Sequence, residues 1–305
     1  GKGRRRSLCS SGSESSSSAI RYRFLHDRVQ QAAYTLIPED QKPTAHYRIG
    51  RHLLKNLSET EQQDSLFALV GHLNFGQHLI TDHNEQKTLA RFNLQAGEKA
   101  LASVAYTAAV DYLETGVKLL TLDDWASQYS LCFNLYRSLC VAYLNNAAYK
   151  KLEQTIPIAL KNISAPTDRV EFYVIDMTKL SFQGDYEKAI EVGRSGLREL
   201  NMEIDNENLS EQVSAEFSIV EKQMENRSIR SLLDLPTDVA PSMQATIKLL
   251  IILEPAVYIL GNIDLYSLIC LRATALSIEY GNVAESIKAY ANYGLLLNLM
   301  KEQYQ

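Results

Sequence analysis

The sequence of this 305-residue chain predicts an all-α fold in which helix pairs stack into a solenoid. The first observation is an apolar stripe over residues 97–120, where small or apolar side chains recur at the 3.6-residue period of a helix. The second is a tyrosine that opens a similar segment three times, at Tyr106, Tyr149 and Tyr186. The third is that sustained period-2 alternation, the pattern of a half-buried strand, is missing from the sequence. We therefore expect almost no strand beyond a short extended piece at Tyr22–Phe24.

The three tyrosines are each followed by small or apolar residues three, seven and ten positions later. Gly97 lies at the small position before Tyr106, where a neighbouring helix can approach closely. The residues after the tyrosines are Ala109, Leu113 and Gly116, then Leu152, Ile156 and Ala159, and finally Ala189, Gly193 and Gly196. These copies are 43 and 37 residues apart, and a weaker copy begins at Gly281-Asn282-Val283. The pattern resembles tetratricopeptide repeats, which are helix pairs with a period of about 34 residues. The sequence thus predicts an α-solenoid of tetratricopeptide-like helix pairs.

Further helices are expected before these copies. Asp27 is a candidate N-cap for a helix that Pro38 ends. Two more helices are expected over 42–57 and 61–80, followed by a turn at 81–87. The side chains expected to face inward from these two helices are Tyr47, Ile49, Leu53, Leu54, Leu57, Leu66, Leu69, Val70, Leu73, Phe75 and Leu79.

The later part of the chain is less regular. We expect one helix over 209–235 and another over 243–260. Pro157 and Pro255 fall inside predicted helices, where proline removes a backbone donor and favours a kink.

The chain divides into three expected regions. Residues 1–20 are Ser-rich with a basic hexamer, and they predict a disordered low-complexity tail or an expression artefact. Residues 21–85 form a helical segment and residues 86–305 the repeats. Because the first residue is Gly1 and no stop signal ends the last helix, we expect the chain to be a piece of a longer protein.

Charge argues against a nucleic-acid partner. The formal net charge is −5, and the first twenty residues contribute +3, so residues 21–305 carry −8. A surface that binds phosphates needs clustered Lys and Arg. An acidic body therefore argues against nucleic-acid binding as the main function.

Neither a membrane span nor an oxidising compartment is expected. The best apolar run, residues 249–253, is short and is bracketed by Lys248 and Glu254. The cysteines are widely spaced, form no CxxC motif and mostly lie in apolar helical contexts that favour burial: Cys9, Cys132, Cys140 and Cys270. These features favour a cytoplasmic protein.

The sequence contains no self-sufficient catalytic or metal motif. It lacks a phosphate loop, a serine nucleophile elbow, a kinase signature and a zinc-protease motif. Two histidine pairs are six residues apart, His46 with His52 and His72 with His78, and this spacing does not put two ligands on one helix face. Asp123-Asp124 is interpreted as a helix start ahead of Trp125. We therefore expect no enzymatic activity, no catalytic residue and no metal site in this chain.

A binding role is the remaining expectation. The concave face of a helix-pair stack is a common docking surface for peptides or domains. The chain has 17 Tyr, and most of them must pack between helices, so the sequence nominates no particular binding residue.

One segment resembles a known class of signalling protein. Residues 24–38, FLHDRVQQAAYTLIP, look like the end of the nucleotide-binding module in STAND-class ATPases of multidomain sensor serine/threonine–histidine kinases. In those proteins a helical-repeat arm follows the ATPase. The stretches 49–54 (IGRHLL), 232–236 (LLDLP) and 280–282 (YGN) also resemble that arm, and the resemblance covers nearly all of 21–305.

The resemblance implies a regulatory arm that couples binding of a ligand or partner domain to a neighbouring nucleotide-binding or kinase domain. It also implies that His26 and Asp27 match a histidine–aspartate motif that senses ADP against ATP at the end of a winged-helix domain. This sequence lacks the ATPase core, so ATP or ADP would bind elsewhere in the parent protein and His26 would be half of a site. A simple capping role for the pair stays open. The rival hypothesis is a freestanding adaptor that binds a peptide.

Overall fold

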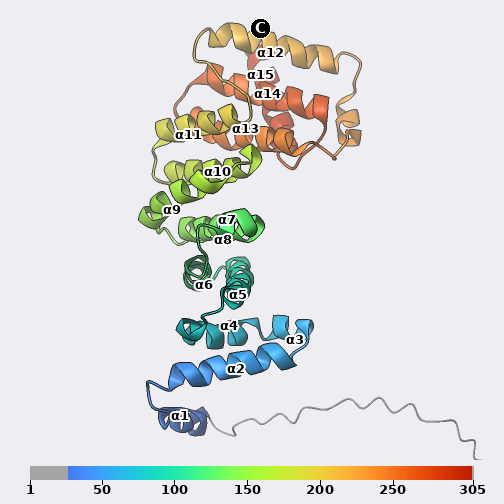
Figure 1. The fold of residues 1–305 in the computed structure, drawn as a ribbon. Coiled ribbons are helices and arrows are strands. Elements are labelled where there is room, and N and C mark those ends of the chain that lie inside the picture. The colour runs from blue at the N-terminus through green and yellow to red at the C-terminus, as the bar shows by residue number, and fades with distance from the viewer. Residues whose placement is uncertain (1–26, 304–305) are drawn as a thin grey trace, which may run out of the picture.

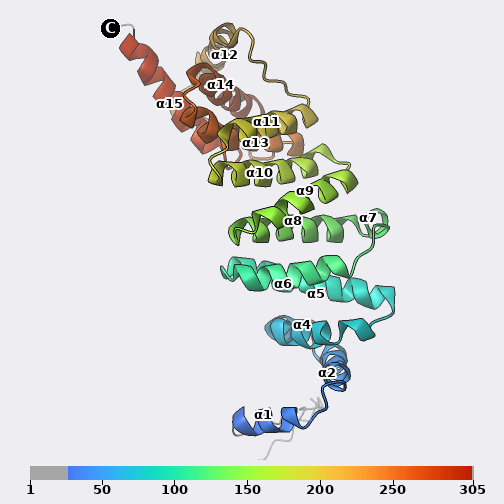
Figure 2. The same cartoon turned by 90° about the vertical axis from the view of Figure 1, so that its left-hand side faces the viewer.

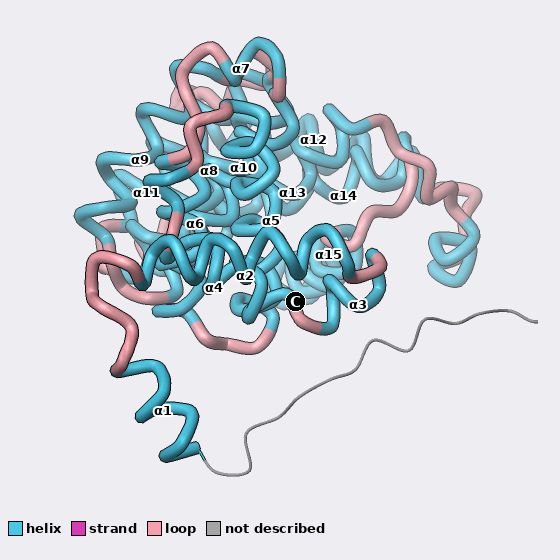
Figure 3. Tube along the Cα trace, turned by 60° about the horizontal axis from the view of Figure 1, so that its bottom comes forward, coloured by secondary structure: helices cyan, strands magenta, loops and turns pink. Residues whose placement is uncertain are grey.

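The computed structural model describes residues 27–303. The tail predicted at 1–20, the extended piece at 22–24, Cys9 and His26 lie outside the described residues. Residues 27–303 form fifteen α-helices and two short 3-10 helices and contain no strand (Figures 1 and 3). The predicted all-α class is confirmed.

The first helices build one end of the molecule. They are α1 (Asp27–Thr35), α2 (Lys42–Asn56), α3 (Glu59–Asp64), α4 (Leu66–Phe75), η1 (Gln77–Leu79), α5 (His83–Ala102) and α6 (Tyr106–Lys118). The middle contains α7 (Asp124–Ser127), α8 (Tyr129–Asn145), α9 (Tyr149–Asn162), α10 (Pro166–Phe182) and α11 (Tyr186–Glu199). The last elements are α12 (Leu209–Met224), η2 (Ile229–Asp234), α13 (Pro241–Ile259), α14 (Ile263–Tyr280) and α15 (Ser286–Gln303).

The helices stack in consecutive pairs to form an α-solenoid. Neighbours such as α5 and α6, α10 and α11, and α13 and α14 pack against each other, and the pairs follow one another along the molecule (Figures 1 and 2). The order changes near the last helices, because α12 packs on α14. Pro157 lies inside α9 and Pro255 inside α13, as predicted.

The three repeat tyrosines follow the same backbone elbow. Each opens its helix two residues after a left-handed residue, with φ of +60° at Val104, +53° at Ala147 and +77° at Gly184. The next residue donates its backbone N–H to the carbonyl five residues earlier, at 2.9 Å in all three turns: Ala105 to Ala100, Ala148 to Tyr143 and Asp185 to Leu180. This is the bond pattern of a Schellman helix end. The three elbows are therefore equivalent, and all three tyrosine side chains are partly buried.

Glycines between paired helices permit close approach. A Cβ at Gly97 of α5 would lie 2.4 Å from Leu113 Cγ of α6, and one at Gly116 of α6 would lie 2.6 Å from Leu135 Cδ2 of α8. The same relation recurs where α11 meets α13, at Gly193 with Leu253 and at Gly196 with Leu249. The predicted role of Gly97 as the small residue of its helix is confirmed.

Several predicted boundaries are wrong because side-chain caps and the elbow at Val104 interrupt the helices. Residues 97–120 form two helices, since α5 ends at Ala102 before the elbow. The helix predicted over 61–80 is three elements, because Ser58 caps α3 with a capping box and α4 begins only at Leu66. The turn predicted at 81–87 is the start of α5, because Asp82 accepts from the backbone N–H of Glu85 at 2.9 Å.

Later boundaries also differ from the predictions. The helix expected over 209–235 ends at Met224, and Ser228 caps η2. The weak fourth copy does not reproduce the elbow, since Gly281 has φ +119° and α15 begins only at Ser286. Three residues expected to face inward are exposed instead: Ile49, Phe75 and Leu79.

The core is divided between two large clusters that meet at α10. Phe172 and Ile175 belong to the cluster formed mainly by α4–α9, whereas Val170 and Met177 belong to the cluster formed with α11, α13 and α14. Within the described part of the chain, α13 alone is long and apolar enough to cross a membrane by length and composition. Half of that stretch is buried inside the protein, as expected for a core helix.

Candidate functional site

The described residues form a large open groove of about 1490 Å³. It is bounded by α8, α10, η2, α13, the turn at 282–285 and the first turns of α15. Its position coincides with α10, where the two core clusters meet. A groove of this size exceeds the usual small-molecule range of about 300–1,000 Å³ and suits a polypeptide segment.

Apolar side chains on the rim of the groove are unusually exposed. Ile229 and Leu233 of η2 and Ile287 of α15 are each about four-fifths exposed, at 81%, 80% and 78%. Their neighbour Leu232 is buried and anchors η2 to the helices beneath it. A cluster of exposed apolar residues beside a hollow marks an interaction surface.

The wall that carries these residues is held by hydrogen bonds across a long stretch of sequence. Asn282 donates its backbone N–H to the carbonyl of Pro236 at 2.7 Å and its Nδ2 to the carbonyl of Leu232 at 2.6 Å. Tyr290 donates its hydroxyl to Asn282 Oδ1 at 2.7 Å. The stretches 232–236 and 280–282 are therefore joined into one wall of the groove.

The opposite side of the groove is polar. Lys248 of α13 donates to Glu171 Oε1 of α10 at 2.7 Å, and Arg137 Nη1 of α8 lies 3.7 Å from Glu171 Oε2. Tyr129 donates to Asp168 at 2.6 Å, and burial together with this carboxylate raises the pKa of the Tyr129 phenol. The buried Nε of Arg137 has no hydrogen-bond partner among the described residues. The groove thus combines an apolar rim with charges fixed by ion pairs.

The predicted nucleotide-sensing pair is not tested by this geometry. His26 lies outside the described residues, and Asp27 is the first residue of α1 but its side chain is not described. The assignment of both residues therefore stays a prediction.

Histidines that are distant in sequence meet between α2 and α4. The Nδ1 atoms of His46 and His72 are 2.9 Å apart, and Tyr34 hydrogen-bonds His46 Nε2 at 3.0 Å. Burial lowers the pKa of His72, and the neighbouring His46 lowers it further. Residues 27–303 contain no group of three or more His, Cys, Asp or Glu side chains placed to hold a metal ion. Spacing within a single helix does not reveal this pair, because His46 and His72 lie 26 residues apart on two different helices.

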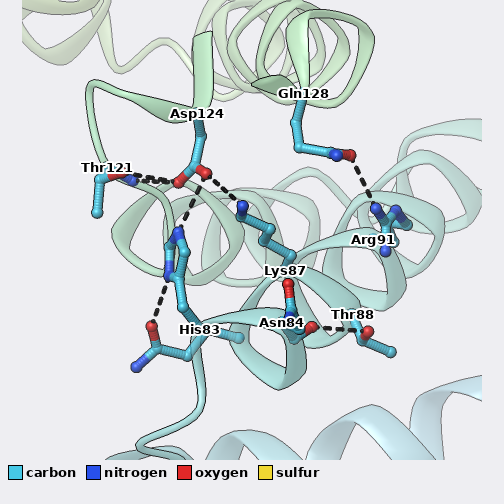
Figure 4. Close-up of polar contacts among 9 residues, drawn as sticks. His83, Asn84, Lys87, Thr88, Arg91, Thr121, Asp124 and Gln128 are labelled. Atoms are coloured by element: carbon cyan, nitrogen blue, oxygen red, sulfur yellow. Dashed lines mark hydrogen bonds and ion pairs between the residues drawn. The ribbon is translucent and has the colours of Figure 1, made fainter. Parts of the chain in front are cut away.

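A second polar centre joins α5 to the start of α7 (Figure 4). The Asp124 carboxylate is only 2% exposed and contacts His83 Nε2 and Lys87 Nζ, both at 3.0 Å. It also accepts the backbone N–H of Thr121 at 2.7 Å and its hydroxyl at 2.9 Å. Burial opposes ionisation of Asp124, but these donors outweigh it and hold the pKa well below its usual range. Both carboxylate oxygens are engaged, Oδ1 with His83 and Lys87 of α5 and Oδ2 with Thr121 of its own turn, so the cluster is structural. Asp124 is the first residue of α7, as the sequence predicted.

The described cysteines are all buried and free: Cys132, Cys140 and Cys270. Burial raises the pKa of Cys132 to about 11 and that of Cys270 to about 12. Thiols of this kind are poor nucleophiles at neutral pH. They act as small core residues, as predicted.

The sequence is distantly similar to a signalling kinase. It is 22% identical over 321 aligned residues to the hybrid signal transduction histidine kinase G of Dictyostelium discoideum, and the alignment covers 92% of this chain. The chain spans only about 9% of that relative's length. No protein-family model matches the chain, and no solved structure matches it. The similarity supports a relationship to signal-transduction kinases.

Proposed function

We propose that this chain is a non-catalytic regulatory arm of a signalling ATPase–kinase, built from tetratricopeptide-like helix pairs. A protein domain or peptide of the same polypeptide would occupy the groove between α10, η2, α13 and α15. Its presence there would alter the activity of a neighbouring nucleotide-binding or kinase domain. In this proposal ATP and ADP bind that neighbouring domain, with His26 and Asp27 at its boundary, and the arm contacts neither nucleic acid nor membrane.

The groove is the observation that carries the proposal. Ile229, Leu233 and Ile287 present apolar surface that a soluble protein normally covers. The hydrogen bonds of Asn282 fix the wall before any partner arrives, which lowers the entropy cost of binding. The similarity to a small part of a very long histidine kinase further supports a role inside a larger polypeptide.

The rival proposal is a freestanding adaptor that binds a peptide in the same groove. A Walker phosphate loop encoded upstream of Gly1 would favour the regulatory arm, and a start codon there would favour the adaptor. A third possibility, an enzyme in its own right, requires ATP hydrolysis by the purified chain. We expect none.

The test uses the full-length protein that contains this chain. The variant Leu233→Asp with Ile287→Asp puts charges on the apolar rim, and Leu122→Asp is the matched control because Leu122 is 72% exposed but lies outside the groove. We expect the double variant to change kinase autophosphorylation at least about fivefold, equivalent to about 1 kcal/mol of lost coupling, and the control to leave it unchanged. Equal activities of all three proteins would contradict the regulatory role.

A further inference from the structure

A smaller pocket of about 600 Å³ lies between α2 and α5. These two helices each pack on α4 and leave a gap over Leu73. The floor of the gap is apolar and consists of Leu54, Leu73, Ile80, Leu89 and Phe92. A volume of this size lies within the range of about 300–1,000 Å³ that is usual for small-molecule sites.

The mouth of the pocket is set by one carboxylate that bridges the two helices. Glu85 of α5 forms an ion pair with Arg51 of α2 and accepts the Tyr47 hydroxyl at 3.2 Å. The hydrogen bond to Glu85 also raises the pKa of Arg51. Glu85 and Arg51 therefore pair with each other and connect α2 to α5 at the mouth of the pocket.

The other two charged residues of the pocket differ in whether they have a bonding partner within the protein. Asp82 accepts the backbone N–H of Glu85 at 2.9 Å and caps α5. Lys55 lines the same pocket as an exposed side chain, and its ammonium makes no hydrogen bond or ion pair with the described residues. Asp82 stays negatively charged but interacts with the N-terminus of α5, so Lys55 is the cation at the mouth that has no ion-pair partner within residues 27–303.

We propose that this pocket binds a small amphiphilic acid. The apolar body of the ligand lies on Leu73 and Leu89, and its carboxylate, phosphate or sulfonate group pairs with Lys55. A neutral ligand of the same shape fills the floor but gains nothing from Lys55. The inference is independent of the proposed function, because the pocket and the groove share no lining residue.

The experiment compares two fluorescent probes on the purified chain. Anilinonaphthalene sulfonate is the acidic probe, and N-phenylnaphthylamine has a similar ring system without the sulfonate. We expect Lys55→Gln to weaken binding of the sulfonate about fivefold, the effect of one partly exposed ion pair, and to change binding of the neutral probe less than about twofold. Thr88→Trp, which fills the pocket from α5, should abolish binding of both probes.

The control variant removes apolar surface from the groove. Leu233→Ser with Ile287→Ser should leave binding of both probes unchanged, which separates this pocket from the groove. Circular dichroism checks that each variant folds, and if Thr88→Trp does not fold, the comparison of the two probes on Lys55→Gln decides. Equal weakening of both probes by Lys55→Gln, no weakening of either, or loss of sulfonate binding in the groove variant would each overturn the proposal.

Discussion

Asn282 holds Leu232 across fifty residues of sequence, with its Nδ2 donating to the Leu232 carbonyl at 2.6 Å. The contact joins the turn before α15 to η2 and so shapes one wall of the groove. It also brings together the stretches 232–236 and 280–282, which lie far apart in the sequence. The apolar rim of the groove therefore depends on a polar contact behind it.

Replacing this asparagine should loosen the wall. Asn282→Ala removes the bonds to Leu232 and Tyr290 and leaves a partly buried carbonyl unpaired, so we expect a loss of about 2 kcal/mol in the free energy of unfolding. Hydrogen exchange should accelerate over 229–235. The control Asn145→Ala, which removes only a bond to its own helix, should cost less than about 0.5 kcal/mol. Unchanged exchange over 229–235 would contradict the role of Asn282.

The equivalent elbows predict opposite effects for opposite substitutions. Ala147 has a positive φ, so Ala147→Gly should stabilise the protein by about 0.5–1 kcal/mol. Gly184 has the same backbone and open space around it, so Gly184→Ala should destabilise it by about 1 kcal/mol through backbone strain alone. Urea denaturation of both variants measures the two effects. Shifts of the same sign would mean that the elbows differ.

The close approach of α5 and α6 predicts a paired effect. Gly97→Ala puts a Cβ against Leu113 and should cost about 1–3 kcal/mol by overpacking. Adding Leu113→Ala makes room, so the double variant should lose less free energy of unfolding than the sum of the two single losses.

Gly71 is a helical glycine with nothing near its Cβ position, and Gly71→Ala should stabilise the protein by about 0.5–1 kcal/mol.

The Asp124 cluster predicts an acid-dependent loss of stability. The folded-state pKa of Asp124 lies below its unfolded value of about 4, so its contribution is present above that value and is lost as pH falls through the folded pKa. Asp124→Asn should cost about 3 kcal/mol at pH 7 because it leaves Lys87 without its buried partner. Between pH 5 and pH 2 the variant should lose less stability than the native protein. Parallel pH profiles would contradict this account.

The sequence predicts the parts of the fold that depend on neighbouring residues and misses those that depend on distant ones. The tyrosine spacing at 106, 149 and 186 locates three elbows because each elbow is a local turn. Over 97–120 the apolar stripe alone does not reveal this break, because it continues through the elbow and Val104 occupies the left-handed position with no glycine to mark it. The groove is missed because six separate segments form it, and its one sequence signal is the apolar run in η2, which does not continue the period of α12.

The most direct test is photocrosslinking from the groove in the full-length protein. A benzoylphenylalanine at position 233 lies on the apolar rim, and the same residue at position 122 is the control outside it. A regulatory arm predicts that position 233 alone forms an adduct with one defined segment of the same polypeptide, identified by mass spectrometry. Adducts at 233 that do not differ from those at 122 would contradict the claim that this groove receives a partner.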